Sequence, residues 1–301
     1  LFGKLYKDDF EGIFDAEALN RLISYIKSNT NKITIVYGNG CCAKSLNGLY
    51  DIITYLDITP KQVPLRAKNG LFKNIGDDVA RPYKELMRRC YYIDIELSCH
   101  LRGHLLKEGK IDNYIMSDNP NGIKLIPKKA LDEIFSSLSK YPFRCKPVYL
   151  EGVWGGEYLR KIRKLPKEMK NCAWVFDLIP LEVSILVDAG DNLLEFPYFT
   201  FVQKEGEAIM GKECVEKFGG YFPIRFNYDD TFHSSGNMSI QVHPGEKYVK
   251  ENNGEFGRQD ESYYVVATGH GAKTYIGFTE DGDFDEFIKE IKKSEVEFTP
   301  V

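Results

Sequence analysis

The stretch Ser239–Pro244, SIQVHP, alternates apolar and polar side chains in the pattern of a β-strand. Residues two apart in a strand point to the same side, so Gln241 and His243 are expected to project together. Glu261 follows eighteen residues after His243, directly before the apolar run SYYVV. An amide oxygen, an imidazole and a carboxylate suit a borderline divalent ion such as Zn²⁺. Two interpretations follow from the pattern: a zinc site, or a plain strand end whose polar side chains are solvated.

Other short apolar runs surround this stretch, and each is bounded by turn-forming residues. The runs are CAWVFDLIP (172–180), EVSILVD (182–188), MSIQVHP (238–244), SYYVVAT (262–268) and KTYIGFT (273–279). Short strands at such close intervals are typical of a sandwich or jelly roll. We therefore predict an all-β domain over residues 146–301, with a terminal helix in the charged segment 283–298.

Residues 1–145 have a different pattern, in which helical segments alternate with short apolar runs. Helical periodicity covers residues 15–27 and 77–89, and short apolar runs that predict strands lie at residues 33–36, 50–59, 90–100 and 112–119. Helices that alternate with short apolar strands indicate an α/β layer with a largely parallel sheet. The chain is thus predicted to hold an α/β region followed by an all-β domain.

Composition excludes several classes of partner. The 301 residues carry a formal net charge of -4 without a long basic run, so neither nucleic acid nor a membrane surface is expected. No apolar run is long enough to cross a bilayer. The seven cysteines are odd in number and lack CxxC spacing, which predicts reduced thiols and a cytoplasmic protein.

Several motifs of the second half resemble, in order and spacing, the metal-site region of type I phosphomannose isomerases, which are cupin-fold enzymes. The motifs are FPIRFNYDDTFHSSGNMSIQVHP (222–244), GRQDESYYVV (257–266) and GAKTYIGF (271–278). Upstream, EGVWGGEYLR (151–160) is similar to the W-G-G motif of that family, and CAWVFDL (172–178) stands where the family has S-W-E. The resemblance implies a cupin jelly roll for residues 146–301.

The resemblance also implies a function. In that family the corresponding residues bind zinc, and these roles fall on Gln241, His243 and Glu261. The implied reaction interconverts mannose 6-phosphate and fructose 6-phosphate by moving a proton between C2 and C1. The substrate is then a phosphorylated hexose, and Arg258, Lys250 and Arg225 are candidates, by position only, to bind its phosphate. No catalytic base is assigned.

Departures from the family pattern leave an alternative open. Arg258–Glu261 replaces the usual G-K-T-E, and the S-W-E glutamate is absent. The family's fourth ligand is a later histidine that the sequence to Val301 does not contain, so we expect either a longer protein or an incomplete site. His233 and His270 lie in Ser/Gly turns and are predicted to be loop residues. The alternative is a non-catalytic, cupin-like sugar-binding or regulatory protein.

The segments VYGNGCCAKS (36–45) and YDIITYLDIT (50–59) resemble, more weakly, the later half of a nucleoside-kinase-like domain. Some bacterial isomerase-like proteins have such a region before their cupin. A P-loop is absent, which argues against a phosphotransferase. Cys41 and Cys42 are predicted to pack in the turn and core rather than to act as nucleophiles, because no histidine lies near them in sequence to activate a thiol. His100 and His104 have the spacing of a zinc helix, but Leu101 replaces the required glutamate, so a surface helix is predicted.

Overall fold

The computed structural model describes residues 4–234, 236–269 and 271–296. It divides into two compact units whose segments alternate along the chain. Unit 1 comprises Leu1–Pro147, Asp177–Phe226 and Pro244–Arg258, and unit 2 comprises Val148–Phe176, Asn227–His243 and Gln259–Val301. The predicted division between residues 145 and 146 stays a prediction. Each unit is described by itself.

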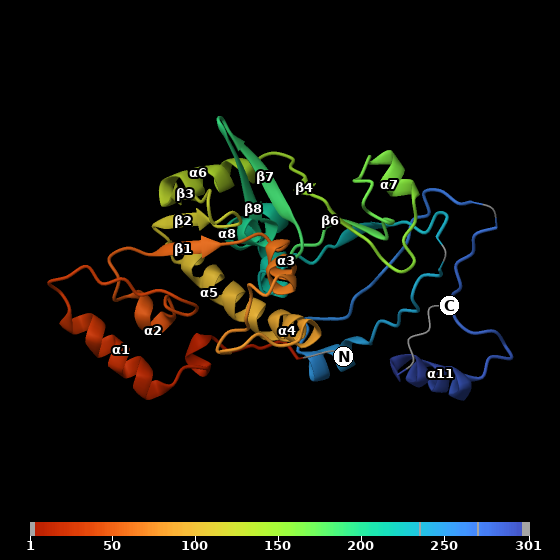
Figure 1. Cartoon of the computed structure of the whole chain (residues 1–301), viewed down its shortest axis with the longest axis horizontal. Coiled ribbons are helices and arrows are strands. Elements are labelled where there is room, and N and C mark those ends of the chain that lie inside the picture. The colour runs from red at the N-terminus through yellow and green to blue at the C-terminus, as the bar shows by residue number, and fades with distance from the viewer. Residues whose placement is uncertain (1–3, 235, 270, 297–301) are drawn as a thin grey trace. The chain divides into compact units, whose positions relative to one another are not determined.

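The first sheet of unit 1 joins β1 (Thr54–Asp57), β2 (Asn113–Met116) and β3 (Lys124–Pro127) in that order (Figure 1). β1 and β2 are parallel, whereas β2 and β3 are antiparallel. The predicted strands at 50–59 and 112–119 are therefore confirmed. Tyr114 of β2 and Ile126 of β3 are register partners and both are buried, so one face of the sheet packs into the core.

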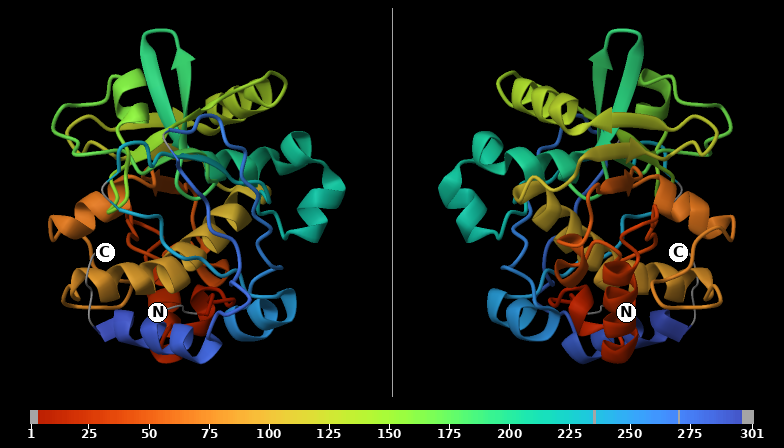
Figure 2. Two further views of the ribbon diagram at one scale, coloured as in Figure 1. Left: turned by 90° about the vertical axis from the view of Figure 1, so that its right-hand side faces the viewer. Right: turned by 90° about the vertical axis from the view of Figure 1, so that its left-hand side faces the viewer.

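A second sheet of unit 1 joins β4 (Cys145–Lys146), β7 (Ser184–Ala189) and β8 (Asn192–Pro197). β7 and β8 form a hairpin, which projects at the top of Figure 2. The prediction of a strand over residues 182–188 is confirmed by β7.

Helices make up most of the rest of unit 1. They are η1 (Phe10–Gly12), α1 (Ala16–Ser28), α2 (Lys44–Asn47), α3 (Gln62–Lys68), α4 (Tyr83–Arg89), η2 (Cys90–Asp94), α5 (Ile95–Lys107), α6 (Lys128–Leu138), α8 (Tyr198–Met210), α9 (Lys212–Lys217), α10 (Glu246–Tyr248) and η3 (Val249–Asn253). The predicted helix at 15–27 corresponds to α1, and the helix predicted at 77–89 is shorter and corresponds to α4. No helix in the described part of the chain is long and apolar enough to cross a membrane.

The core of unit 1 is aromatic and also holds one buried ion pair. Phe135 of α6 contacts the rings of Phe196 and Phe201 edge to face, with centroids 4.9 and 5.3 Å away. Beside them, Arg102 of α5 donates to both carboxylate oxygens of Asp57 at the end of β1. Burial of this pair is compatible with stability because further hydrogen bonds to Asp57 satisfy its oxygens. Those bonds come from the Tyr114 hydroxyl at 2.6 Å and the Thr200 hydroxyl at 2.9 Å.

Unit 2 contains fewer regular elements. Most residues of a third sheet belong to it: β5 (Val148–Leu150), β6 (Trp174–Leu178) and β9 (Phe226–Asp229), of which Asp177, Leu178 and Phe226 are counted in unit 1. The helices of unit 2 are α7 (Tyr158–Ile162) and α11 (Phe284–Val296). β6 confirms the strand predicted at 172–180, and α11 confirms the terminal helix. Edge-to-face packing of Trp154 on Trp174, with ring centroids 4.5 Å apart, anchors the sheet.

Several predicted strands are wrong. Residues 90–100 are helical, spanning η2 and the start of α5, because Cys90, Leu97 and neighbouring apolar residues bury one helical face. Residues 33–36 form no strand, and Ile33 is 96% exposed. The predicted strands at 238–244, 262–268 and 273–279 are likewise coil, with a bend at Gly277. Without a hydrogen-bonded neighbour, an alternating pattern does not make a strand.

The fold class is therefore mixed α/β. The described residues form three three-stranded sheets, of which one is partly parallel. No closed barrel joins the strands of the described residues.

Candidate functional site

Two of the three predicted zinc ligands meet in unit 2. His243 Nε2 lies 2.8 Å from Glu261 Oε2, and about a third or less of each side chain is exposed. Both residues belong to unit 2 although eighteen positions separate them in the sequence. Gln241 is exposed, and no hydrogen bond or ion pair among the described residues joins it to His243 or Glu261. The structure thus gathers an imidazole nitrogen and a carboxylate oxygen, without the third donor.

The carboxylate of Glu261 is held by two neighbours in sequence. Gln259 Nε2 donates to Oε2 at 3.0 Å, and the Tyr263 hydroxyl donates to Oε1. Partial burial, together with this hydrogen bond, raises the pKa of Tyr263 and keeps its phenol a donor. These two contacts fix the orientation of Glu261 toward His243, as outer partners of metal ligands do.

A second carboxylate lies within electrostatic reach of Glu261. Burial raises the pKa of Asp229, at the end of β9, and the negative charge of Glu261 raises it further. The Asn227 side chain donates to Asp229 Oδ1 at 2.7 Å, which opposes the shift. Asp229 was not predicted from the sequence. The signal available was its position in NYDD, ahead of the ligand stretch.

The W-G-G motif has a packing role in unit 2. A Cβ on Gly155 would lie 2.1 Å from Asn171 Oδ1, and one on Gly156 would lie 2.3 Å from Asp230 Oδ1. These glycines are therefore required for close approach rather than for an unusual backbone conformation. Asp230, which the sequence analysis also missed, is 5% exposed and accepts from the Leu159 and Phe232 amides.

The predicted phosphate-binding cations lie in unit 1. The Lys250 ammonium pairs with Glu246, and Arg258 adds to the lowering of the pKa of that carboxyl. Arg225 opposes the burial that raises the pKa of Glu182. Each of these cations thus acts on a carboxylate of its own unit.

His233, also in unit 2, is a loop residue. His233 has a left-handed backbone with φ of 60°, and its ring packs edge-on against Phe232 with centroids 4.2 Å apart. This agrees with its prediction as a loop residue. His270 lies outside the described residues.

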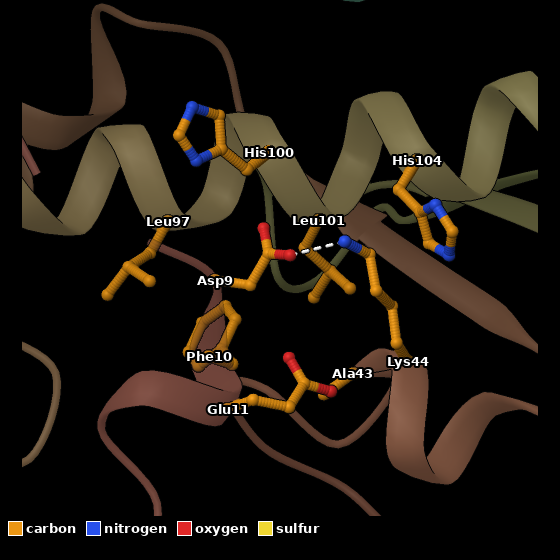
Figure 3. A pocket seen from close by; sticks show the side chains of 9 residues that line it. All are labelled: Asp9, Phe10, Glu11, Ala43, Lys44, Leu97, His100, Leu101 and His104. Atoms are coloured by element: carbon orange, nitrogen blue, oxygen red, sulfur yellow. Dashed lines mark hydrogen bonds and ion pairs between the residues drawn. The ribbon is translucent and has the colours of Figure 1, made fainter. Parts of the chain in front are cut away.

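His100 and His104 line a small pocket of unit 1 (Figure 3). Its volume of about 10 Å³ has room for about one water molecule. Both histidines lie on the face of α5 that borders the pocket, and a Lys44–Asp9 ion pair lies opposite them. No group of three metal-ligating side chains occurs in the described part of the chain, here or in unit 2.

A family model matches residues 1–140. It describes a domain of unknown function, DUF8485. No curated protein and no solved structure matches the chain.

Proposed function

We propose that this chain is a zinc-dependent aldose–ketose isomerase that interconverts mannose 6-phosphate and fructose 6-phosphate in the cytoplasm. His243 and Glu261 are its zinc ligands, with Gln241 as a third. Residues 1–145 form a kinase-like region in this proposal, and residues 146–301 carry a cupin-type site. The observation that carries it is the 2.8 Å contact between His243 Nε2 and Glu261 Oε2.

The contact supports the proposal because nothing local requires it. No strand among the described residues aligns the two segments, yet the imidazole and the carboxylate lie within bonding distance. The 2.8 Å separation is that of a direct ion pair, and a tetrahedral zinc ion with bonds of about 2.0–2.1 Å would hold the two donors about 3.3 Å apart. A small separation of the two side chains would therefore let zinc replace the direct contact. A bound zinc ion would polarise the carbonyl or hydroxyl oxygen of the sugar as a Lewis acid.

The protein's own contribution is to orient these ligands. Tyr263 and Gln259 hold both oxygens of Glu261, so that the carboxylate faces His243. Such outer contacts raise metal affinity by about 10- to 100-fold in known sites.

A second candidate function is a sugar-binding or regulatory protein without catalysis. This function is favoured because only two of the three donors, His243 and Glu261, are in contact among the described residues. The two functions share the His243–Glu261 site and differ in turnover.

One experiment tests both functions. Zinc content is measured by mass spectrometry after dialysis, and fructose 6-phosphate formation from mannose 6-phosphate is followed in a coupled assay. Zinc with turnover supports the isomerase, and zinc without turnover supports the binding protein. His243→Ala should abolish zinc binding at this site, whereas the control His233→Ala should retain it. Zinc binding that His243→Ala leaves unchanged would overturn both candidates.

A further inference from the structure

The adjacent cysteines of unit 1 lie in a turn whose shape is fixed. Gly38 and Gly40 have positive φ angles of 122° and 80°, which favour glycine. A Cβ on Gly40 would also come within 2.6 Å of a ring carbon of Phe10. The Cys41 amide donates to the Gly38 carbonyl at 3.3 Å, so the turn closes directly before the thiols.

Both thiols of this turn are half-buried and lie side by side. The Cys41 and Cys42 sulfurs are 3.8 Å apart, and neither is in a disulfide. On the far side of the turn, the Tyr50 hydroxyl donates to the Cys41 carbonyl at 2.7 Å. The two sulfur atoms are therefore presented together by a braced backbone.

The sulfur separation suits a shared ligand better than a disulfide. Neighbouring Cα atoms are about 3.8 Å apart, below the range of about 4.4–6.8 Å that disulfides span, so a bond between them would be strained. In a tetrahedral site with metal–sulfur bonds of about 2.3 Å, two thiolates lie about 3.8 Å apart. The observed spacing matches the second arrangement.

The buried thiols elsewhere in the chain differ from this pair in pKa. Burial raises the pKa of Cys90 and of Cys145 to about 12 and that of Cys99 and of Cys172 to about 11. The hydrogen bond with Cys42 instead lowers the pKa of Cys41 to about 7, and the same contact raises the pKa of Cys42 well above its ordinary value. Cys41 is therefore the thiolate that binds a soft ligand first, and Cys42 gives up its proton when the second bond forms.

We infer that Cys41 and Cys42 form a two-thiolate site that chelates one thiophilic centre, either a soft metal ion or trivalent arsenic. Two protein donors leave the other positions of the bound centre open to solvent or to an external thiol. Such a site exchanges its ligand readily, unlike a closed structural site with four protein donors. This site is independent of the proposed isomerase function.

The probe is phenylarsine oxide, a trivalent arsenical, added to the reduced full chain. Two arsenic–sulfur bonds form, and the oxide oxygen leaves as water with the two thiol protons. Arsenic stays trivalent and no sulfur is oxidised, so the step needs no oxidant. We expect one arsenical per chain by non-denaturing mass spectrometry, with the loss of two titratable thiols.

Single substitutions test whether both sulfurs act together. Cys41→Ser and Cys42→Ser should each weaken binding by roughly 100-fold or more, because one remaining sulfur cannot chelate the arsenic. Cys214→Ser, at a half-buried thiol elsewhere in unit 1, and His243→Ala should bind as the wild type does. Wild-type affinity in both Cys41→Ser and Cys42→Ser would overturn the inference.

A second measurement on the unsubstituted protein does not depend on how the variants fold. A dithiol competitor should remove the arsenical, whereas a monothiol at the same thiol concentration should not. Equal removal by both competitors would show attachment through one sulfur and would also overturn the inference.

Discussion

The strands β1–β3 of unit 1 and the SIQVHP stretch of unit 2 both hold short apolar segments in sequence, yet they differ in structure. Ile126 in β3 is 4% exposed, whereas Ile240 in the SIQVHP stretch is 76% exposed. β3 pairs with β2 along its whole length, and residues 238–244 pair with no strand of the described chain. A short apolar segment can therefore line a sheet, and a hydrogen-bonded neighbour decides whether it does.

The two units also differ in how they bury charge. Unit 1 encloses the Asp57–Arg102 pair, with each side chain 8% exposed. In unit 2 the His243–Glu261 pair remains about a third and a quarter exposed. The first pair is positioned to act on stability, and the second is accessible to a ligand.

The largest effect is expected from breaking the buried pair. Asp57→Ala leaves Arg102 buried without its counter-ion and should lower the free energy of unfolding of unit 1 by about 3–5 kcal/mol. Far-UV ellipticity in urea follows mainly the helices of this unit, because unit 2 has only α7 and α11 among its described residues, whereas Trp154 and Trp174 fluorescence follows unit 2. Asp188→Ala, at an exposed carboxylate of β7, should change the free energy by about 0.5 kcal/mol or less. Equal effects of the two substitutions would refute a structural role for the pair.

A matched isoleucine substitution tests the comparison between the paired strand β3 and the unpaired SIQVHP stretch. Ile126→Ala removes buried methyl groups and should cost about 2–5 kcal/mol. Ile240→Ala makes the same chemical change at an exposed position and should cost about 0.5 kcal/mol or less. Urea unfolding and amide exchange over residues 113–127 and 237–244 measure both. A cost of several kcal/mol for Ile240→Ala would mean that SIQVHP is paired in solution.

Much of unit 1 is predictable because its signals are local. Helical periodicity predicts the helix over residues 15–27, and in the structure Asp15 caps it by accepting from the Ala18 amide at 2.7 Å. The strands at 54–57 and 113–116 follow from short apolar runs between turn residues. The strand predicted at residues 90–100 was wrong because a short apolar run fits a buried strand and a buried helix equally well.

The candidate sites depended on information that periodicity does not carry. Strand periodicity predicted only that Gln241 and His243 point to the same side. The contact of His243 with Glu261 is visible in the structure alone. That contact links two segments of coil, so only the ordered resemblance of several motifs pointed to it. The Cys41–Cys42 spacing depends on two left-handed glycines and on the ring of Phe10, a residue about 30 positions away in sequence.

Asp230 tests how unit 2 holds together with few regular strands. Its carboxylate accepts from the Leu159 amide at 2.7 Å and from the Phe232 amide at 2.9 Å. Asp230→Ala leaves these donors unsatisfied, and we expect a loss of about 1–3 kcal/mol. Tryptophan fluorescence in urea measures this loss. Asp230→Asn keeps one acceptor oxygen, so its free energy of unfolding should lie between those of the wild type and Asp230→Ala. A shift of the ellipticity transition alone would contradict this assignment to unit 2.

The smallest effect is expected at the start of α1. This helix buries no residue completely, so its end contacts carry a larger share of its local stability than they do in α5. Asp15→Ala removes the acceptor for the Ala18 amide and should cost about 0.5–2 kcal/mol, with faster amide exchange confined to residues 16–28. Asp15→Ser restores a capping oxygen and should recover most of the protection. If exchange instead accelerates throughout unit 1, α1 unfolds together with the core rather than as a separate, locally stabilised element.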